Sequence, residues 1–158
     1  MDLIETLAAI AEIRDLKARY FRGVDEKDEA LLRDVFADDI EIDYRGSTTD
    51  PVTGTGIAPE ATDDILRGGE ASARLVASAL QGVVSVHHTS EPEIEIIDAE
   101  NARGIWPMVD RLKFSGDGPY AELIGYGHYH ETYVLERGRW RIRTLLLTRS
   151  RLDFIPRA

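Results

Sequence analysis

Four residues carry side chains that could together move a proton: the phenol of Tyr20, the carboxylate of Asp25, the imidazole of His87 and the guanidinium of Arg149. Imidazole titrates close to neutral pH, so His87 is the best candidate for a general base. A carboxylate can hold one imidazole nitrogen and stabilise the imidazolium that forms. A phenol can donate to an oxygen that gains charge or departs, and an arginine in an apolar pocket can bind a carboxylate, phenolate or enolate. These residue types predict proton transfer on an apolar substrate.

Each of the four residues also has an ordinary structural explanation. Tyr20 could be a core tyrosine bonded to a backbone carbonyl, and Asp25 could cap the turn between two helices. His87 could lie on the outer face of a strand or in an interface, and Arg149 could end a strand in water beside Arg151. The proton-transfer hypothesis therefore requires that the side chains converge on one cavity.

Two histidines are adjacent at His87 and His88, and neighbouring side chains of a strand point to opposite faces. Only one of them can enter a given pocket, and we favour His87. His128 and His130 have the i, i+2 spacing that could suggest a metal site, but no motif adds a carboxylate ligand, so we expect no metal. We also expect no organic cofactor, because the sequence has no phosphate loop, dinucleotide fingerprint or nucleophile elbow.

The N-terminal part of the chain must position Tyr20 and Asp25. Apolar residues recur every three or four positions from Leu3 to Val24, which predicts an amphipathic helix with Tyr20 on its apolar face. Asp28 is predicted to be the N-cap of a short second helix. Asp25 should therefore lie where the first helix ends.

The middle of the chain contains one strand, one loop and one helix. Residues 40–44 alternate as a strand does, whereas residues 45–58 are turn formers. Such a long loop is often a lid or a binding segment, although it could be a plain surface excursion. Residues 60–81 predict a helix with a break at Gly68-Gly69.

The remainder of the chain is rich in strands. Short turn signals separate four candidates, which are residues 83–97, 101–114, 120–136 and 139–150. Short connections favour antiparallel pairing of successive strands. Helices followed by a meander indicate one α+β domain over residues 1–158, with the helices packed on one face of a curved sheet.

Bulk properties exclude several classes of protein. The formal net charge is −10, which argues against non-specific binding to nucleic acid or to an anionic membrane. No apolar run is long enough to span a bilayer, and no basic segment at the N-terminus suggests a signal peptide. The absence of cysteine removes disulfides and thiolate chemistry. We therefore expect a cytoplasmic protein.

Several segments carry a resemblance to a known family. They are residues 13–22 with Asp25, residues 92–96, residues 102–106 with Asp110, and residues 140–142 followed by Arg149. Together they resemble the SnoaL-like family of cone-shaped α+β barrels, which have a cystatin-like fold related to nuclear transport factor two. Scytalone dehydratase, ketosteroid isomerase and polyketide cyclases belong to it. The similarity runs from about residue 10 to about residue 152.

The resemblance implies roles for the four candidate residues, and within the family it is strongest to bile acid 7-alpha dehydratases. Tyr20 matches a tyrosine that polarises a substrate oxygen. Asp25 matches the aspartate that supports a catalytic histidine, and His87 matches that histidine. Arg149 matches an arginine near the end of the last strand.

The resemblance defines the substrate less closely than it defines the roles of the four candidate residues. The bile acid enzymes have a second histidine a few residues after the first, where this chain has Ser90, and His88 is an extra histidine. The run from Trp106 to Met108 could be pocket wall or ordinary core. The residues expected to bind substrate are His88, Trp106, Met108, Asp110 and Tyr129.

The implied function is a cofactor-independent lyase of the dehydratase type, acting on a small apolar cyclic or steroid-like molecule. The same scaffold could instead support an isomerase or a polyketide cyclase, or a non-catalytic protein that binds small molecules or assembles. We expect a homo-oligomer, either a dimer or a trimer, with no nucleic-acid or membrane partner.

Overall fold

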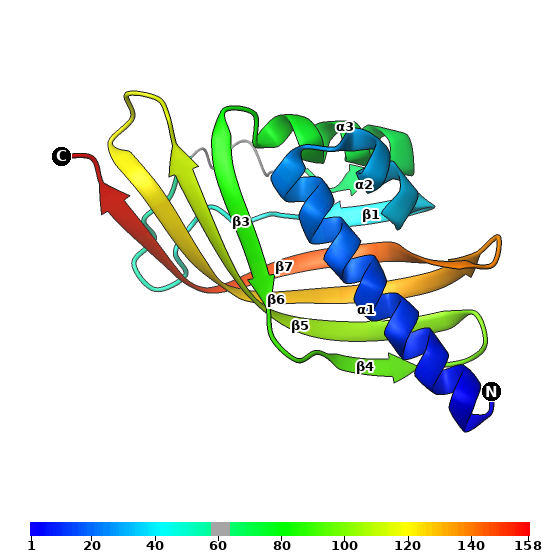
Figure 1. Cartoon of the computed structure of the whole chain (residues 1–158). Helices are drawn as coiled ribbons and strands as arrows, with labels where there is room; N and C mark the ends of the chain where they lie inside the picture. Colours follow the sequence, from blue (N-terminus) through cyan, green and yellow to red (C-terminus); the bar gives the residue numbers. More distant parts are fainter. Residues whose placement is uncertain (58–63) are drawn as a thin grey trace.

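The computed structural model describes residues 1–57 and 64–158, and its helices cover one face of a curved sheet (Figure 1). The elements in chain order are α1 (Leu3–Glu26), α2 (Glu29–Val35), β1 (Phe36–Asp43), β2 (Leu66–Arg67), α3 (Gly69–Ala79), β3 (Val83–Thr89), β4 (Glu93–Ile96), β5 (Asn101–Phe114), β6 (Tyr120–Glu136) and β7 (Arg139–Pro156). The predicted α+β architecture with a mainly antiparallel sheet is confirmed.

The sheet has the strand order β2-β1-β7-β6-β5-β3, and β4 also pairs with β5. Strands β5, β6 and β7 form the predicted antiparallel meander. Strand β1 pairs in parallel with β7, so that Phe36 lies opposite Ile142. Turn signals could not predict this pairing, because it joins segments that are far apart in the sequence.

The single strand predicted over residues 83–97 is two strands, β3 and β4, which pair with different parts of β5. The interruption contains Pro92, which cannot donate to a ladder. The facing stretch of β5 contains Pro107, which neither β3 nor β4 pairs. A proline is tolerated inside β5 because no ladder forms on that side.

Strand β7 continues to Pro156, beyond the predicted end at residue 150, and contains bulges at Arg143 and at Ser150. Gly127 pairs with Arg149 and Tyr126 pairs with Arg151, which leaves Ser150 as an extra residue. Beyond Ser150, the buried positions change from odd numbers, Leu145 and Leu147, to an even one, Leu152. The bulge therefore allows Arg149 to face the interior without forcing Arg151 to follow it.

Helix α1 has well-defined ends, which explains its length. Asp2 and Glu5 form a capping box at its start. Lys27 ends the helix in the left-handed conformation, and its backbone N–H donates to a carbonyl of the last turn. Asp28 accepts from the backbone N–H of Leu31, which confirms the predicted N-cap of α2. These two helix ends place Asp25 beside the sheet.

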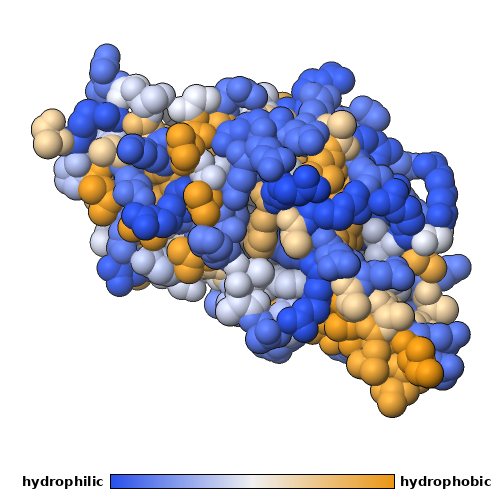
Figure 2. Space-filling view, viewed as in Figure 1, coloured by the Kyte–Doolittle hydropathy of each residue, from blue (hydrophilic) through white to orange (hydrophobic). Residues whose placement is uncertain are grey.

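The apolar face of α1 is only partly covered. Its second half is buried, whereas Leu3 is 74% exposed and Leu7 58% exposed. The helix extends past the edge of the sheet at its N-terminus (Figure 1), and the uncovered side chains form an apolar end in Figure 2. No helix within residues 1–57 and 64–158 is long and apolar enough to cross a membrane.

The helix predicted over residues 60–81 is shorter than expected. Residues 60–63 lie outside the described part of the chain, β2 occupies Leu66–Arg67, and α3 begins only at Gly69. Gly68 adopts a positive φ of 82°, which a glycine accommodates without strain. The predicted break therefore marks the true start of the helix.

The loop predicted over residues 45–58 is ordered through residue 57, and residue 58 lies outside the described part. Asp50 organises this loop: its Oδ1 accepts from the backbone N–H groups of Val52 and Thr53. Its Oδ2 accepts from the backbone N–H of Leu152 in β7 at 2.7 Å. These bonds lower the pKa of Asp50 to about 2, and they attach the loop to the sheet.

Candidate active site

A cavity of about 480 Å³ lies between α1, α3, the loop after β1 and the inner face of the sheet. Most of its lining is aliphatic or aromatic. The polar side chains that reach it are those of Tyr20, Tyr44, Ser47, Thr48, Asp64, Ser78, His87, Asp110, Tyr129 and Arg149. A small apolar cavity with a few polar groups is the usual form of a ligand site.

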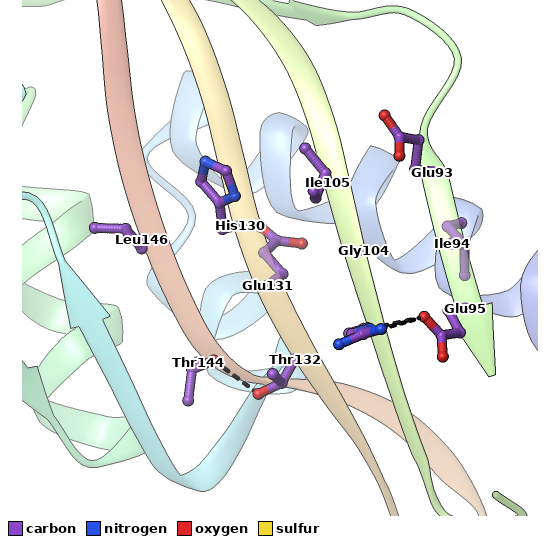
Figure 3. A pocket seen from close by; sticks show the side chains of 11 residues that line it. Glu93, Ile94, Glu95, Gly104, Ile105, His130, Glu131, Thr132, Thr144 and Leu146 are labelled. Carbon is purple, nitrogen blue, oxygen red and sulfur yellow. Dashed lines mark hydrogen bonds and ion pairs between the residues drawn. The ribbon is translucent and has the colours of Figure 1, made fainter. Parts of the chain in front are cut away.

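A larger depression of about 700 Å³ lies on the opposite, outer face of the sheet (Figure 3). Its lining includes Ile105, His130 and Leu146, and it contains none of the four predicted catalytic residues. The imidazoles of His128 and His130 lie on this outer side, with ring centroids 6.3 Å apart. Within the described residues, no cluster of three potential metal ligands occurs.

Asp25 and His87 form a close pair, although 62 residues separate them. The Oδ1 atom of Asp25 lies 2.6 Å from Nδ1 of His87, and its Oδ2 accepts from the His87 backbone N–H at 3.0 Å. Because an ionised carboxylate can only accept, Nδ1 of His87 is the donor, and in the neutral imidazole the lone pair would therefore lie on Nε2. Partial burial opposes ionisation, but the hydrogen bonds from His87 hold the pKa of Asp25 below its ordinary value.

The other side of the His87 ring faces a buried ion pair. Nε2 lies 3.9 Å from Oδ2 of Asp110. Both oxygens of Asp110 accept from Arg149, each at 2.8 Å, and Nε of Arg149 donates to the carbonyl of Ser47 at 2.8 Å. Gly125 makes room for this pair, since an added Cβ would overlap both side chains. A proton received at Nε2 would thus lie beside a second carboxylate.

Three phenols gather at the floor of the cavity. The hydroxyl of Tyr20 lies 2.7 Å from that of Tyr44, and the Tyr129 ring meets the Tyr20 ring edge-on at a centroid distance of 5.8 Å. Burial is the main cause that raises the pKa of each of these three tyrosines. They therefore keep their protons at neutral pH and can donate hydrogen bonds.

A second buried ion pair lies directly beneath these phenols. Lys17 is 1% exposed and is paired with Glu131, and its Nζ lies 3.6 Å from the centroid of the Tyr129 ring. Burial outweighs the attraction of Glu131 and lowers the pKa of Lys17 to about 8. Glu131 also accepts from the Tyr133 hydroxyl, which accepts from Nε1 of Trp106. This polar chain fills the interior where the cavity ends.

Three of the four candidate residues, Tyr20, His87 and Arg149, line the cavity. Asp25 does not line it but is hydrogen-bonded to His87. Of the residues expected to bind substrate, Asp110 and Tyr129 line the cavity, but three others do not. His88 is exposed on the outer side, because it alternates with His87 along β3.

Trp106 and Met108 do not line the cavity either. They face inward but are buried in the core, where Trp106 donates to Tyr133 and the sulfur of Met108 lies 3.4 Å from Nη1 of Arg149. Sequence reasoning missed Tyr44, although it continues the inward alternation of Ile40 and Ile42.

A family model described as a SnoaL-like domain matches residues 5–145. Among solved structures, one provisionally assigned as a scytalone dehydratase from Novosphingobium aromaticivorans is 17% identical, with a TM-score of 0.76, over 96% of this chain and 91% of that chain. A LinA-type3 hexachlorocyclohexane dehydrochlorinase from Novosphingobium barchaimii is 21% identical, with a TM-score of 0.73, over 99% and 95%. At these identities the structural likeness concerns the fold.

Proposed function

The chain belongs to the SnoaL-like domain family, and on that premise we propose that it is a cofactor-independent lyase of the dehydratase type. One observation carries the proposal: Asp25 holds Nδ1 of His87 at 2.6 Å, so that Nε2 would be the acceptor of the neutral imidazole, at an apolar cavity that also holds neutral phenols. The substrate would be a small cyclic or steroid-like molecule with a carbonyl and a hydroxyl group.

In the proposed reaction, Nε2 of His87 takes a proton from a carbon next to the carbonyl. The electron pair of the broken C–H bond forms a C=C bond, and the C–O bond to the hydroxyl breaks. The imidazolium returns its proton to the departing hydroxyl, which leaves as water. Asp25 and Asp110 would stabilise the imidazolium while it exists.

The phenols would stabilise the oxygen side of the reaction. Tyr20 and Tyr44 share a hydrogen bond, so one hydroxyl can donate to the other while that one donates to the substrate carbonyl. Donors that are already in place when charge develops lower the barrier without reorganisation. Tyr20 is therefore the proposed donor, and Tyr44 is the proposed support.

Two similar structures support elimination. One is provisionally assigned as a scytalone dehydratase and another is a hexachlorocyclohexane dehydrochlorinase, both names of enzymes that remove a small molecule. An isomerase or cyclase would use the same base without loss of water. The mass of the product separates these outcomes, because only dehydration lowers it by one water.

The test is a panel of neutral steroid and polyketide hydroxyketones, incubated with protein and followed by mass spectrometry. His87→Ala should lower the rate by at least about 100-fold. His88→Ala is a matched control, because the His88 side chain is exposed on the side of β3 opposite to His87. Equal turnover by wild type and His87→Ala would show that His87 is not the base.

We also propose that copies of the chain associate through the outer face of the sheet. The depression in Figure 3 combines half-exposed apolar side chains, Ile105 at 36% and Leu146 at 39%, with polar neighbours. Light scattering after size exclusion would give the mass. A dimer or trimer that Leu146→Glu dissociates would support the proposal, and a monomer would contradict it.

A further inference from the structure

The guanidinium of Arg149 is already occupied by groups of the protein. Nη1 and Nη2 donate to the two oxygens of Asp110, and Nε donates to the carbonyl of Ser47. The side chains of Arg149 and Asp110 are 6% and 4% exposed. A bidentate pair of this kind satisfies both charges within the protein. The expectation that Arg149 receives a substrate anion therefore does not fit this geometry.

The charges around the cavity also disfavour an anion. Among the described residues that line it, Arg149 is the one arginine or lysine, and it is neutralised by Asp110. Asp64 adds a carboxylate to the lining, and Asp25 lies directly behind His87. A carboxylate or phosphate entering this cavity would lose its water without gaining a positive partner, which costs free energy.

The hydrogen-bond donors that remain available are uncharged. Tyr20, Tyr44 and Tyr129 all reach the cavity, and their raised pKa values keep the hydroxyls protonated. A neutral phenol can donate to a carbonyl or hydroxyl oxygen without requiring a counter-charge. The cavity thus offers the contacts that a ketone, alcohol or phenol can use.

We propose that Asp110 determines the charge specificity of the cavity: by neutralising Arg149, it restricts ligands to those that are uncharged at the end facing His87. The inference rests on the proposed function in that the same cavity receives the substrate. Ketones, alcohols and phenols belong to the accepted class, whereas molecules with a carboxylate, phosphate or sulfate at this end are rejected.

The test compares two probes with the same ring system, 2-naphthol and 2-naphthoate, by isothermal titration calorimetry at neutral pH. Wild type should bind the neutral 2-naphthol at least about tenfold more tightly, since one unpaired charge costs more than a factor of ten in an apolar site. Asp110→Asn leaves Arg149 with a free positive charge, so this variant should bind 2-naphthoate more tightly than wild type does by a similar factor.

Asp43→Asn is the matched control. It makes the same substitution in a carboxylate that is also paired with an arginine, Arg45, but at the surface. Its preference for 2-naphthol should equal that of wild type. Circular dichroism checks the fold of each variant, and if Asp110→Asn does not fold, a wild type that binds 2-naphthoate as tightly as 2-naphthol still overturns the inference.

Three results would overturn the inference: equal or tighter binding of 2-naphthoate by wild type, binding of neither probe, or a folded Asp110→Asn with the wild-type preference. The readout requires no turnover, so failure of the inference can be told apart from failure of the lyase proposal. If wild type prefers the neutral probe but catalyses no reaction, the protein is a receptor for neutral ligands and the lyase proposal is wrong. If wild type turns over substrate but shows no charge preference, only the proposed role of Asp110 is wrong.

Discussion

Asp25 binds His87 at two points, through the ring nitrogen Nδ1 at 2.6 Å and through the backbone N–H at 3.0 Å. The backbone contact fixes the position of the carboxylate, and the ring contact fixes the tautomer. Because Phe21 stacks on the imidazole with ring centroids 5.8 Å apart, the ring has little freedom to rotate. The end of helix α1 therefore sets the orientation of an imidazole that belongs to strand β3.

Asp25→Asn should lower the rate of the reaction by about 100- to 10,000-fold, because an amide neither fixes the tautomer as firmly nor stabilises the imidazolium. Single-turnover kinetics would measure this effect. Asp28→Asn is the control three residues away, since asparagine is as good an N-cap as aspartate. A rate for Asp25→Asn within about twofold of the control would contradict the pairing role.

Tyr20→Phe should lower the rate by at least about 100-fold, the usual effect of removing one donor to a developing oxyanion. Tyr44→Phe should have a smaller effect, because Tyr44 acts through its 2.7 Å bond to Tyr20. The comparison is made by kcat at saturating substrate. Tyr126→Phe, on the outer side of β6, is the control. A larger effect at Tyr44 than at Tyr20 would reverse the two roles.

The buried pair of Lys17 and Glu131 should be mutually dependent. Lys17→Met leaves a buried carboxylate without a partner and should reduce the free energy of unfolding by roughly 3–5 kcal/mol. Adding Glu131→Gln should recover most of this loss while keeping an acceptor for Tyr133. Urea denaturation measures both changes.

The exposed pair of Arg103 and Glu95 is the comparison for the Lys17 and Glu131 variants. Arg103→Met should lower the free energy of unfolding by less than about 1 kcal/mol. Additive effects of Lys17→Met and Glu131→Gln would show that the two buried groups do not interact.

The loop held by Asp50 should depend on pH. The pKa of Asp50 is about 2 in the folded protein, below the unfolded value of about 4. The carboxylate therefore contributes stability above pH 4, and this contribution is lost as the pH falls towards 2. Asp50→Ala should melt below wild type at pH 7, with a difference that shrinks in acid.

Asp117→Ala, in an exposed turn, controls for the loss of a charge in these melting experiments. A difference between wild type and Asp50→Ala that stays constant from pH 7 to low pH would show that the ionised carboxylate is not what holds the loop.

Local patterns predicted the elements whose rules are local. The helix period placed Tyr20 inward, the N-cap rule placed Asp28, and alternation separated His87 from His88. The strand ranges 101–114 and 120–136 match β5 and β6 in full. In each case a residue's environment is set by neighbours within a few positions.

The remaining features depend on contacts between distant segments. The bulges at Arg143 and Ser150 set which residues of β7 face inward, and no turn residue marks either of them. Asp110 and Arg149 lie on different strands, so their pairing required the register through Gly125 and Gly127. The role of Arg149 accordingly changed from a candidate anion receptor to half of a buried ion pair.

The parallel contact between β1 and β7 has a consequence for how the molecule reaches its folded state. During synthesis, Phe36 must wait for Ile142 before it has a strand partner, because β2 pairs only with Glu41 and Ile42 of β1. Contacts so distant in sequence slow folding, because the intervening chain must be ordered first. Until then the apolar side chains of α1 and β1 remain available to chaperones or to aggregation. Asp25 and His87 can meet before that step, but Arg149 belongs to β7 and can join them only afterwards.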